Sequence, residues 1–344
     1  MSFEISFRIL ESESTFLDPR KKFMPETEQF QVRFDPLTNR SGHFCHFGAI
    51  KPQRLPLDLY AMPETKGFCP FCPENRKTVT PKFISGILPE GRLEKNQALL
   101  FPNLFPYDIY SAVMIMTEEH VVSLKGFTEE ILKDAFSLGI EFFRRIKTID
   151  PFLPYHIMTW NYMPPSGGGL VHPHQQYFAT ACPGNRFTDE LIASEKFYKT
   201  HGANYWNELI REEKRLNERY IGSDGDSAWL SSFVSTGIFG EIECIFPGVF
   251  SVETFTDTHI DELVRGLLKI FKYYSDKDIY SFNASLTFGP EDQGYFPCHF
   301  RIIARTFLNT REYASDMNFF QSLLAEPLCV FLPEELCKEL KKYF

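Results

Sequence analysis

Two histidines and a glutamine stand at alternating positions in the segment VHPHQQYF, residues 171–178. If this segment is a strand, His172, His174 and Gln176 point to the same face. Pro173 fixes its own backbone angle and favours extended geometry at His172, which makes the spacing rigid. Imidazole can be a nucleophile, a proton carrier or a metal ligand near neutral pH. The pattern therefore indicates a chemical site, with a polar strand beside a flexible loop as the alternative.

Three consecutive glycines precede these histidines, at positions 167–169. Glycine lets the backbone approach a ligand closely and present N–H groups to it. Imidazole can attack phosphorus and pass the group on to an acceptor, and the carboxamide of Gln176 can donate to a phosphate oxygen in the transition state. Glycines beside histidines thus favour phosphoryl or nucleotidyl chemistry, in which His174 attacks and His172 is available to hold a metal.

A second group of candidate residues is the pair Cys69 and Cys72 in the segment CPFC. Two thiolates at this spacing can bind one cation, but a structural zinc site needs four ligands, and no second CxxC occurs in the chain. His120 and His172 are candidates for the remaining ligands, although neither spacing is diagnostic. A redox pair is an alternative, but the prolines predict a loop here and not the start of a helix. Two half-buried thiols without a metal are a third interpretation.

The composition is that of an acidic globular protein. Of the 344 residues, 43% are hydrophobic and 24% are charged, which provides for a large core. The net charge of −9 argues against non-specific nucleic-acid binding, which needs a basic surface. No apolar stretch is long enough to span a bilayer and no signal peptide is recognised, so no membrane contact is expected. Eight cysteines fit a reducing compartment, and we expect a cytoplasmic protein.

The elements that must position these residues form a weak repeat. Segments that start at Phe127 and Phe255 both predict amphipathic helices. Each helix is flanked by predicted strands, and each copy then reaches a histidine, His174 in the first and His299 in the second. A duplicated strand–helix–strand–loop–strand unit explains this pattern, with two unrelated amphipathic helices as the alternative. Because the second copy keeps only one of the histidines, we expect a single active site in the first copy.

The segments around this repeat are predicted from their turn and helix signals. Residues 1–60 predict strands and turns, and residues 68–81 predict a proline-rich loop. Residues 188–200 and 204–219 predict two polar helices. These segments complete a chain in which strands and helices alternate irregularly.

The motifs resemble those of galactose-1-phosphate uridylyltransferases, a family of the histidine-triad superfamily. The family signature Asn-x5-Gly-x4-His-Pro-His-x-Gln matches this chain from Asn161 to Gln176 without a gap. The segments CPFCPEN and TEEHVVSLKGFT resemble the family's zinc loop and third-ligand segment. The resemblance covers most of the chain and implies an α+β fold of two tandem histidine-triad-like repeats, each an antiparallel sheet with packed helices. Residues 1–185 would carry the zinc loop and the active site, and residues 186–344 would be a degenerate copy.

The resemblance implies a role for each matching residue. His174 is expected to be the nucleophile, and Gln176 the amide that contacts phosphate. Zinc is the expected cofactor, and its implied ligands are Cys69, Cys72, His120 and His172. The implied substrate contacts are Lys51, Arg54, Phe101, Asn103, Asn161, Gly167, Gly168 and Gly169.

The implied reaction is ping-pong nucleotidyl transfer. A UMP group would pass from a UDP-hexose to His174 and then to a second hexose 1-phosphate, so a nucleotide sugar and a sugar 1-phosphate are the expected partners. The alternatives are an adenylyl-transferring relative of the ADP-glucose phosphorylase type, a hydrolase and a non-catalytic nucleotide-binding protein.

Two departures from the family pattern concern substrate recognition. The family usually has a serine in place of Gly169, and residues 317–331 depart from the segment that the family donates to a partner subunit. A homodimer is expected from the resemblance alone.

Overall fold

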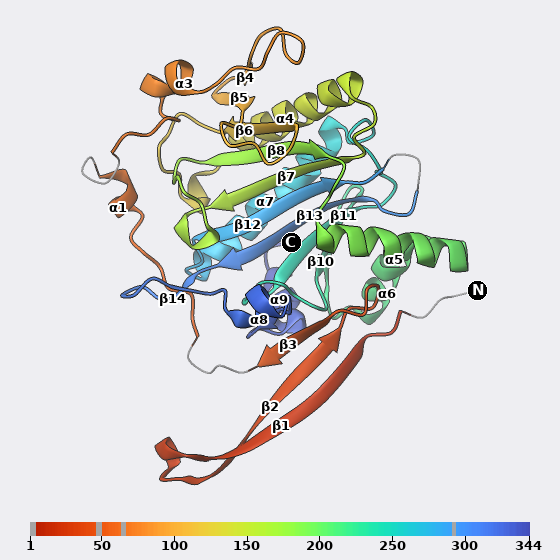
Figure 1. The fold of residues 1–344 in the computed structure, drawn as a ribbon. Helices are drawn as coiled ribbons and strands as arrows, with labels where there is room; N and C mark the ends of the chain where they lie inside the picture. The colour runs from red at the N-terminus through yellow and green to blue at the C-terminus, as the bar shows by residue number, and fades with distance from the viewer. Residues whose placement is uncertain (1–4, 46–49, 63–66, 291–293) are drawn as a thin grey trace.

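A ten-stranded sheet organises the protein. The computed structural model describes residues 5–45, 50–62, 67–290 and 294–344. The strand order is β4-β5-β6-β8-β7-β12-β13-β11-β10-β9, and Figure 1 labels these strands from β4 to β10. Every neighbouring pair in this sheet is antiparallel. With helices packed against it, the sheet confirms the predicted α+β fold class.

The first half of the sheet carries one copy of the predicted unit. Its strands are β4 (Leu93–Lys95), β5 (Ala98–Pro102), β6 (Tyr110–Ile115), β7 (Tyr155–Tyr162) and β8 (His174–Thr180). Helix α4 (Glu129–Ile149) lies between β6 and β7 in the chain. The hydroxyl of Thr128 accepts the N–H of Ile131, and two glutamates occupy the first turn, so the helix begins where the sequence predicts.

The second half repeats this order of elements. Its members are β9 (Tyr220–Asp224), β10 (Ser227–Ser231), β11 (Glu241–Phe246), α7 (Asp257–Asp276), β12 (Ser281–Phe288) and β13 (Cys298–Arg305). The halves meet where β7 pairs with β12, with Thr159 opposite Ser285 and Asn161 opposite Asn283. One apolar core contains residues from both halves, and the division at residue 185 stays a prediction.

The N-terminal strands form a separate sheet together with one short strand from near the C-terminus. Its strands are β1 (Arg8–Asp18), β2 (Met24–Phe34), β3 (Ser41–Cys45) and β16 (Leu328–Cys329), in that order. The β1–β2 hairpin, with the short 3-10 helix η1 (Pro19–Lys21) at its turn, projects from the body in Figure 1. These strands agree with the strands and turns predicted for residues 1–60, and the short helix α1 (Asp58–Ala61) starts at the end of this region.

The remaining elements are helical segments and a short hairpin. They are η2 (Leu124–Gly126), η3 (Pro164–Ser166), α5 (Asn185–His201), α6 (Tyr205–Leu216), β14 (Phe307–Asn309), β15 (Ala314–Ser315), α8 (Phe319–Leu323) and α9 (Pro333–Leu340). Helices α5 and α6 confirm the two predicted polar helices. In the part of the chain that is described, no helix has the length and apolar character needed to cross a membrane.

The proline-rich loop predicted for residues 68–81 is partly wrong. Residues Pro73–Val79 form helix α3, which starts directly after Cys72. Pro73 occupies the first helical position, where a backbone N–H has no helical partner and proline is favoured. The carbonyl of Cys72 accepts the N–H groups of Asn75 and Arg76, both at 2.9 Å. Proline therefore begins this helix where we expected it to prevent one.

The two faces of the large sheet are covered differently. Helices α4 and α7 lie on one face, where the rings of Tyr177 and Trp229 lie against Gly139 and Gly266 of these helices. On the opposite face, helices α5 and α6 cover the second half with an apolar cluster of their own. The segment around Cys69 and Cys72 covers only β5 and β6 of the first half. Part of the first half therefore stays open on this face.

Candidate functional site

Strand β8 carries His174 and Gln176 on the open face of the sheet. His174 lies opposite Ile115 of β6, and Gln176 lies opposite Thr159 of β7. Both side chains are half-buried, whereas Gln175 between them is buried against the helices. The predicted alternation is confirmed from residue 174 onward. The strand begins at His174, so His172 precedes it and does not lie in it as predicted.

The imidazole of His174 has a defined tautomer. Its Nδ1 lies 2.8 Å from the carbonyl oxygen of His172, and because a carbonyl only accepts, Nδ1 carries the proton. Burial lowers the pKa of His174, although the bond to the His172 carbonyl opposes the shift. The ring of Phe71 stands edge-on, with centroids 5.3 Å apart. A neutral imidazole with a free lone pair on Nε2 is the form that acts as a nucleophile.

Gln176 contacts a residue that the sequence did not suggest. Its Nε2 donates to the hydroxyl of Tyr107 at 3.4 Å. Tyr107 lies in the loop between β5 and β6 with 65% of its surface exposed, and its ring is edge-on to Phe178 at 6.4 Å. In the sequence, only its position shortly after the FPN segment indicated that Tyr107 could belong to the site.

Four predicted metal ligands meet beside this strand. The ligand atoms of Cys69, Cys72, His120 and His172 all lie within 4.8 Å of one another. The distance from Sγ of Cys72 to Nδ1 of His120 is 3.4 Å, and the distances from Nδ1 of His172 to the two sulfurs are 3.7 and 3.8 Å. Tetrahedral zinc with ordinary bond lengths places sulfur and nitrogen about 3.6 Å apart. The donor set and its dimensions therefore fit a zinc ion.

The surroundings of His172 prepare it to bind a metal. Its side chain is fully buried, and its Nε2 lies 2.8 Å from the carbonyl oxygen of Thr117. This bond keeps the proton on Nε2 and leaves the Nδ1 lone pair facing the sulfurs. Burial lowers the pKa of His172 to about 4, so the ring is neutral at physiological pH. Nδ2 of Asn75 donates to the Cys69 carbonyl at 2.8 Å and fixes the cysteine turn.

The three glycines of the loop differ in backbone angle and in the space available for a side chain. Gly167 has a φ of +84°, which side-chain-bearing residues rarely adopt. A Cβ on Gly168 would lie 3.2 Å from the carbonyl oxygen of Asn161 and 3.3 Å from that of Met163, so the space there is tight. A Cβ on Gly169 would meet nothing within 4 Å. A serine side chain would therefore fit at Gly169, and the backbone does not require glycine there.

The other predicted substrate residues are dispersed. Phe101 is buried against Phe71, and the side chain of Asn103 accepts the N–H of Phe105 at the start of the Tyr107 loop. Arg54 lies 3.7 Å from Asp278, and Lys51 is exposed. None of the contacts between described residues joins Lys51 or Arg54 to His174 or Gln176, so their roles stay predictions.

A groove extends from Asn161 across the centre of the sheet. Its volume is about 450 Å³. The polar side chains along it come from β7, β11, β12, β13, helix α5 and the segment before β11: Thr159, Asn161, Asn185, Arg186, Thr236, Glu241, Asn283, Ser285, Thr287 and Arg301. Phe178 of β8 also lines the groove, so the groove reaches the strand that carries His174.

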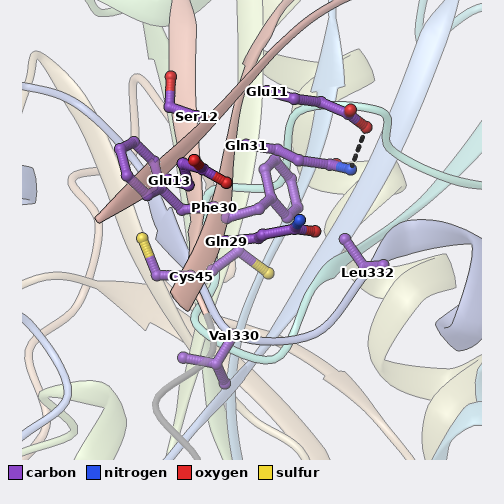
Figure 2. Close-up of a pocket in the computed structure, with 11 residues that line it drawn as sticks. Glu11, Ser12, Glu13, Gln29, Phe30, Gln31, Cys45, Val330 and Leu332 are labelled. Atoms are coloured by element: carbon purple, nitrogen blue, oxygen red, sulfur yellow. Dashed lines mark hydrogen bonds between the residues drawn. The ribbon is translucent and has the colours of Figure 1, made fainter. Parts of the chain in front are cut away.

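A second hollow belongs to the N-terminal sheet. Figure 2 shows it between the β1–β2 hairpin and the segment that contains Val330 and Leu332. Its volume is about 340 Å³, and Nε2 of Gln31 donates to Glu11 at 3.5 Å along its wall. None of the predicted site residues lines it.

The comparisons with known proteins agree on the fold. No protein-family model matches the chain. An uncharacterized protein of Archaeoglobus fulgidus is 29% identical over 326 residues, which span 92% of this chain and 93% of the relative.

Three solved structures are similar over nearly their whole length. An ADP-glucose phosphorylase from Arabidopsis thaliana with bound ADP-glucose has a TM-score of 0.68 and 16% identity, over 91% of this chain and 99% of that chain. A GALT-like protein from the same plant has a TM-score of 0.67 and 17% identity, over 90% and 98%. A uridylyltransferase has a TM-score of 0.63 and 19% identity, over 91% and 97%. The predicted resemblance is therefore confirmed at the level of structure: the chain has the fold that uridylyltransferase and ADP-glucose phosphorylase share.

Proposed function

We propose that the protein is a nucleotidyltransferase that carries a nucleoside monophosphate on His174. The observation that supports this most strongly is the state of the His174 ring. Its Nδ1 proton is bound to the His172 carbonyl, and its Nε2 lone pair is unprotonated on the open face of the sheet. Gln176 would supply an amide donor beside it, and Gly168 and Gly169 would supply backbone N–H groups, as charge on a phosphate in transfer requires.

The reaction proceeds in two displacements at phosphorus. Nε2 of His174 attacks the α-phosphorus of a nucleotide sugar. An N–P bond forms while the bond from this phosphorus to the bridging oxygen breaks, and the sugar 1-phosphate leaves. A phosphate oxygen of the acceptor then attacks the same phosphorus, the N–P bond breaks, and neutral His174 is restored. Nδ1 keeps its proton throughout, so neither step needs a separate proton acceptor.

Zinc at the four-ligand cluster would be structural. Two thiolates and two imidazoles fill a tetrahedral coordination shell and leave no position for substrate. When bound, the ion would cross-link the cysteine turn to the segment that leads into β8. Cys69, Cys72 and His120 would thereby fix His172, whose carbonyl orients the nucleophile.

The substrates we propose are a UDP-hexose and a hexose 1-phosphate. The transferred phosphate would lie beside Asn161 and the hexose further along the groove, where Ser285 and Thr287 supply hydroxyl groups that suit a polyol. A second candidate is an adenylyl-transferring phosphorylase, favoured by the similarity to ADP-glucose phosphorylase. A homodimer and a cytoplasmic location belong to the same proposal.

Isotope exchange tests the covalent route. Labelled glucose 1-phosphate, mixed with the enzyme and UDP-glucose alone, should enter the nucleotide sugar, because His174 holds the nucleotide after the first product leaves. ADP-glucose in a parallel reaction distinguishes the two candidate bases. His174→Ala should abolish the exchange. Exchange that persists in this variant would contradict the proposal.

A further inference from the structure

The carboxamide of Asn283 joins the two halves of the sheet beside the proposed site. Asn283 in β12 is the cross-strand partner of Asn161 in β7. Its Nδ2 donates to Oδ1 of Asn161 at 2.7 Å and to the carbonyl oxygen of Ser166 at 2.9 Å. Ser166 ends the turn that leads into Gly167. One side chain from the second half therefore holds both the asparagine of the site and the start of the glycine loop.

The oxygen of Asn283 is fixed from the other side. Nη1 of Arg305 in β13 donates to Oδ1 of Asn283. The guanidinium of Arg305 binds both carboxylate oxygens of Asp316 at 2.6 to 3.0 Å. Asp316 also accepts the N–H of Thr306 at 3.0 Å, and its side chain is 2% exposed. Because an arginine donates to its oxygen, Asn283 must direct its NH2 group towards Asn161 and Ser166.

This arrangement determines which atom of Asn161 is available to a ligand. Oδ1 of Asn161 is occupied by Asn283, and no described residue accepts a hydrogen bond from its Nδ2. Asn161 lies two residues from Thr159, the partner of Gln176, so Asn161 and Gln176 share the open face. Nδ2 of Asn161 can therefore donate to a phosphate oxygen or a sugar hydroxyl in the groove.

We infer that Asn283 is a positioning residue for nucleotidyl transfer. It orients the Asn161 carboxamide with its donor towards the substrate and anchors the Ser166 turn, while the Arg305–Asp316 pair fixes Asn283 itself. The inference rests on the proposed function. It gives the second half of the sheet a part in the reaction without a second nucleophile.

The first test measures the substitution Asn283→Ala. Without the two N–H donors of Asn283, the Asn161 carboxamide loses its fixed orientation and its hydrogen bond to the charged phosphate, so formation of the nucleotidyl adduct on the protein should slow about tenfold or more. The dissociation constants of UMP and AMP, measured by calorimetry, should rise by a similar factor. Zinc content should stay at the wild-type value. Adduct formation and nucleotide affinity equal to the wild type would overturn the inference.

A double-mutant cycle tests whether Asn283 acts through Asn161. Asn283→Ala should slow adduct formation much less in the Asn161→Ala background than in the wild type, because without Asn161 only the Ser166 contact still depends on Asn283. Independent effects that multiply would show that Asn283 does not act through Asn161 and would overturn the inference.

The Arg305–Asp316 pair has a matched control. Asp316→Asn weakens the pair that fixes Asn283 and should reduce the adduct rate several-fold. Glu213→Gln weakens a comparably buried pair, with Arg219 at 2.9 Å, outside the lining of the groove. The control should leave the adduct rate at the wild-type value. Equal rates in the two variants would overturn the role of Asp316.

Failure of the proposed function has a different signature. If the wild type forms no adduct with UDP-glucose, UDP-galactose or ADP-glucose, the proposed function fails. The affinities of UMP and AMP then still decide the inference, because they depend on Asn161 and not on turnover.

Discussion

Two histidines occupy equivalent places in the two halves of the sheet. Thr159 pairs with Ser285 where the halves meet, Gln176 pairs with Thr159, and Arg301 pairs with Ser285. The approximate two-fold relation therefore puts Arg301 at the place of Gln176. His299 accordingly stands at the place of His174, two residues earlier on its strand.

The two histidines make the same hydrogen bond to the backbone, from Nδ1 to the carbonyl two residues earlier. Nδ1 of His174 lies 2.8 Å from the carbonyl of His172, and Nδ1 of His299 lies 2.6 Å from that of Pro297. Both rings thus have the same tautomer, with the lone pair on Nε2. The tautomer is a property of the repeated unit and does not by itself make a nucleophile.

The two histidine rings differ in how far their surroundings bury them. His299 is 0% exposed, with Trp206 of helix α6 at 4.2 Å and Phe296 at 4.6 Å between ring centroids. Burial lowers its pKa well below the ordinary value. His174 has one aromatic neighbour, Phe71, at 5.3 Å between ring centroids, and its side chain is only half-buried. A substrate can therefore reach one Nε2 and not the other.

The neighbours of the rings differ in charge. Where the first half has Gln176, the second has Arg301, which binds Glu243 at 2.6 Å and Glu190 at 2.8 Å. Arg186 binds the buried Glu241 at 2.7 Å in the same network. The comparison teaches that one scaffold can present a neutral donor beside an accessible ring or close the same place with ion pairs.

The largest expected effect separates the two histidines. His174→Ala should reduce nucleotidyl transfer by at least about 10³-fold, because the covalent route is lost. His299→Ala should keep the activity of folded protein within about twofold but lower the free energy of unfolding by about 3 kcal/mol, because it leaves a cavity beside Trp206. Turnover and urea unfolding of both variants measure this. Equal activity losses would remove the distinction between the halves.

The structure of the first half should depend on bound zinc, whereas that of the second half should not. Cys69→Ser removes one of four ligands, so we expect bound zinc to fall from about one per chain to substoichiometric amounts. The segment before β8 should loosen, which hydrogen exchange can localise. Cys298→Ser, at a buried cysteine outside the cluster, should keep its zinc. Unchanged zinc in Cys69→Ser would contradict the assignment.

The second half should depend on its ion pairs. Burial alone would raise the pKa of Glu241, but the Arg186 guanidinium outweighs burial and lowers the pKa to about 2. Since the folded pKa lies below the ordinary value of 4.5, the stabilisation is complete above about pH 4.5 and disappears as the pH falls towards 2.

Glu241→Gln should therefore lower the free energy of unfolding by about 3 kcal/mol at pH 7, and by much less at pH 3. Urea unfolding at the two pH values measures the difference. Glu195→Gln breaks an exposed pair with Lys199 and should cost less than about 0.5 kcal/mol at either pH. A cost of Glu241→Gln that does not change with pH would show that the ion pair is not its cause.

The smallest expected effect concerns Tyr107. Tyr107→Phe removes the hydroxyl that accepts from Gln176, and we expect transfer to slow about fivefold, the equivalent of about 1 kcal/mol. Because Tyr107 is exposed, the unfolding midpoint should not change. Tyr110→Phe, on the neighbouring strand without a hydrogen bond to Gln176, is the control. Full activity of Tyr107→Phe would show that Gln176 is held in place without it.

The parts of this structure that depend on local periodicity and spacing could be predicted. The helix after Thr128, the strand of His174 and the likeness of the two halves follow from such patterns. Helix α3 could not, because proline at a first helical turn and proline in a loop look alike in the sequence. The roles of Tyr107 and Asn283 could not be predicted, because their partners lie 69 and more than 100 residues away in the chain. Only the folded sheet brings such residues together.

The central claim is that His174, and not His299, carries the nucleotide. Intact-protein mass spectrometry after incubation with UDP-glucose, UDP-galactose or ADP-glucose tests it directly, with peptide mapping of any adduct. We predict one nucleoside monophosphate per chain, attached to the peptide that contains His174, present in His299→Ala and absent from His174→Ala. A wild-type protein that binds these nucleotides tightly but never gains mass, or an adduct that survives in His174→Ala, would contradict the account.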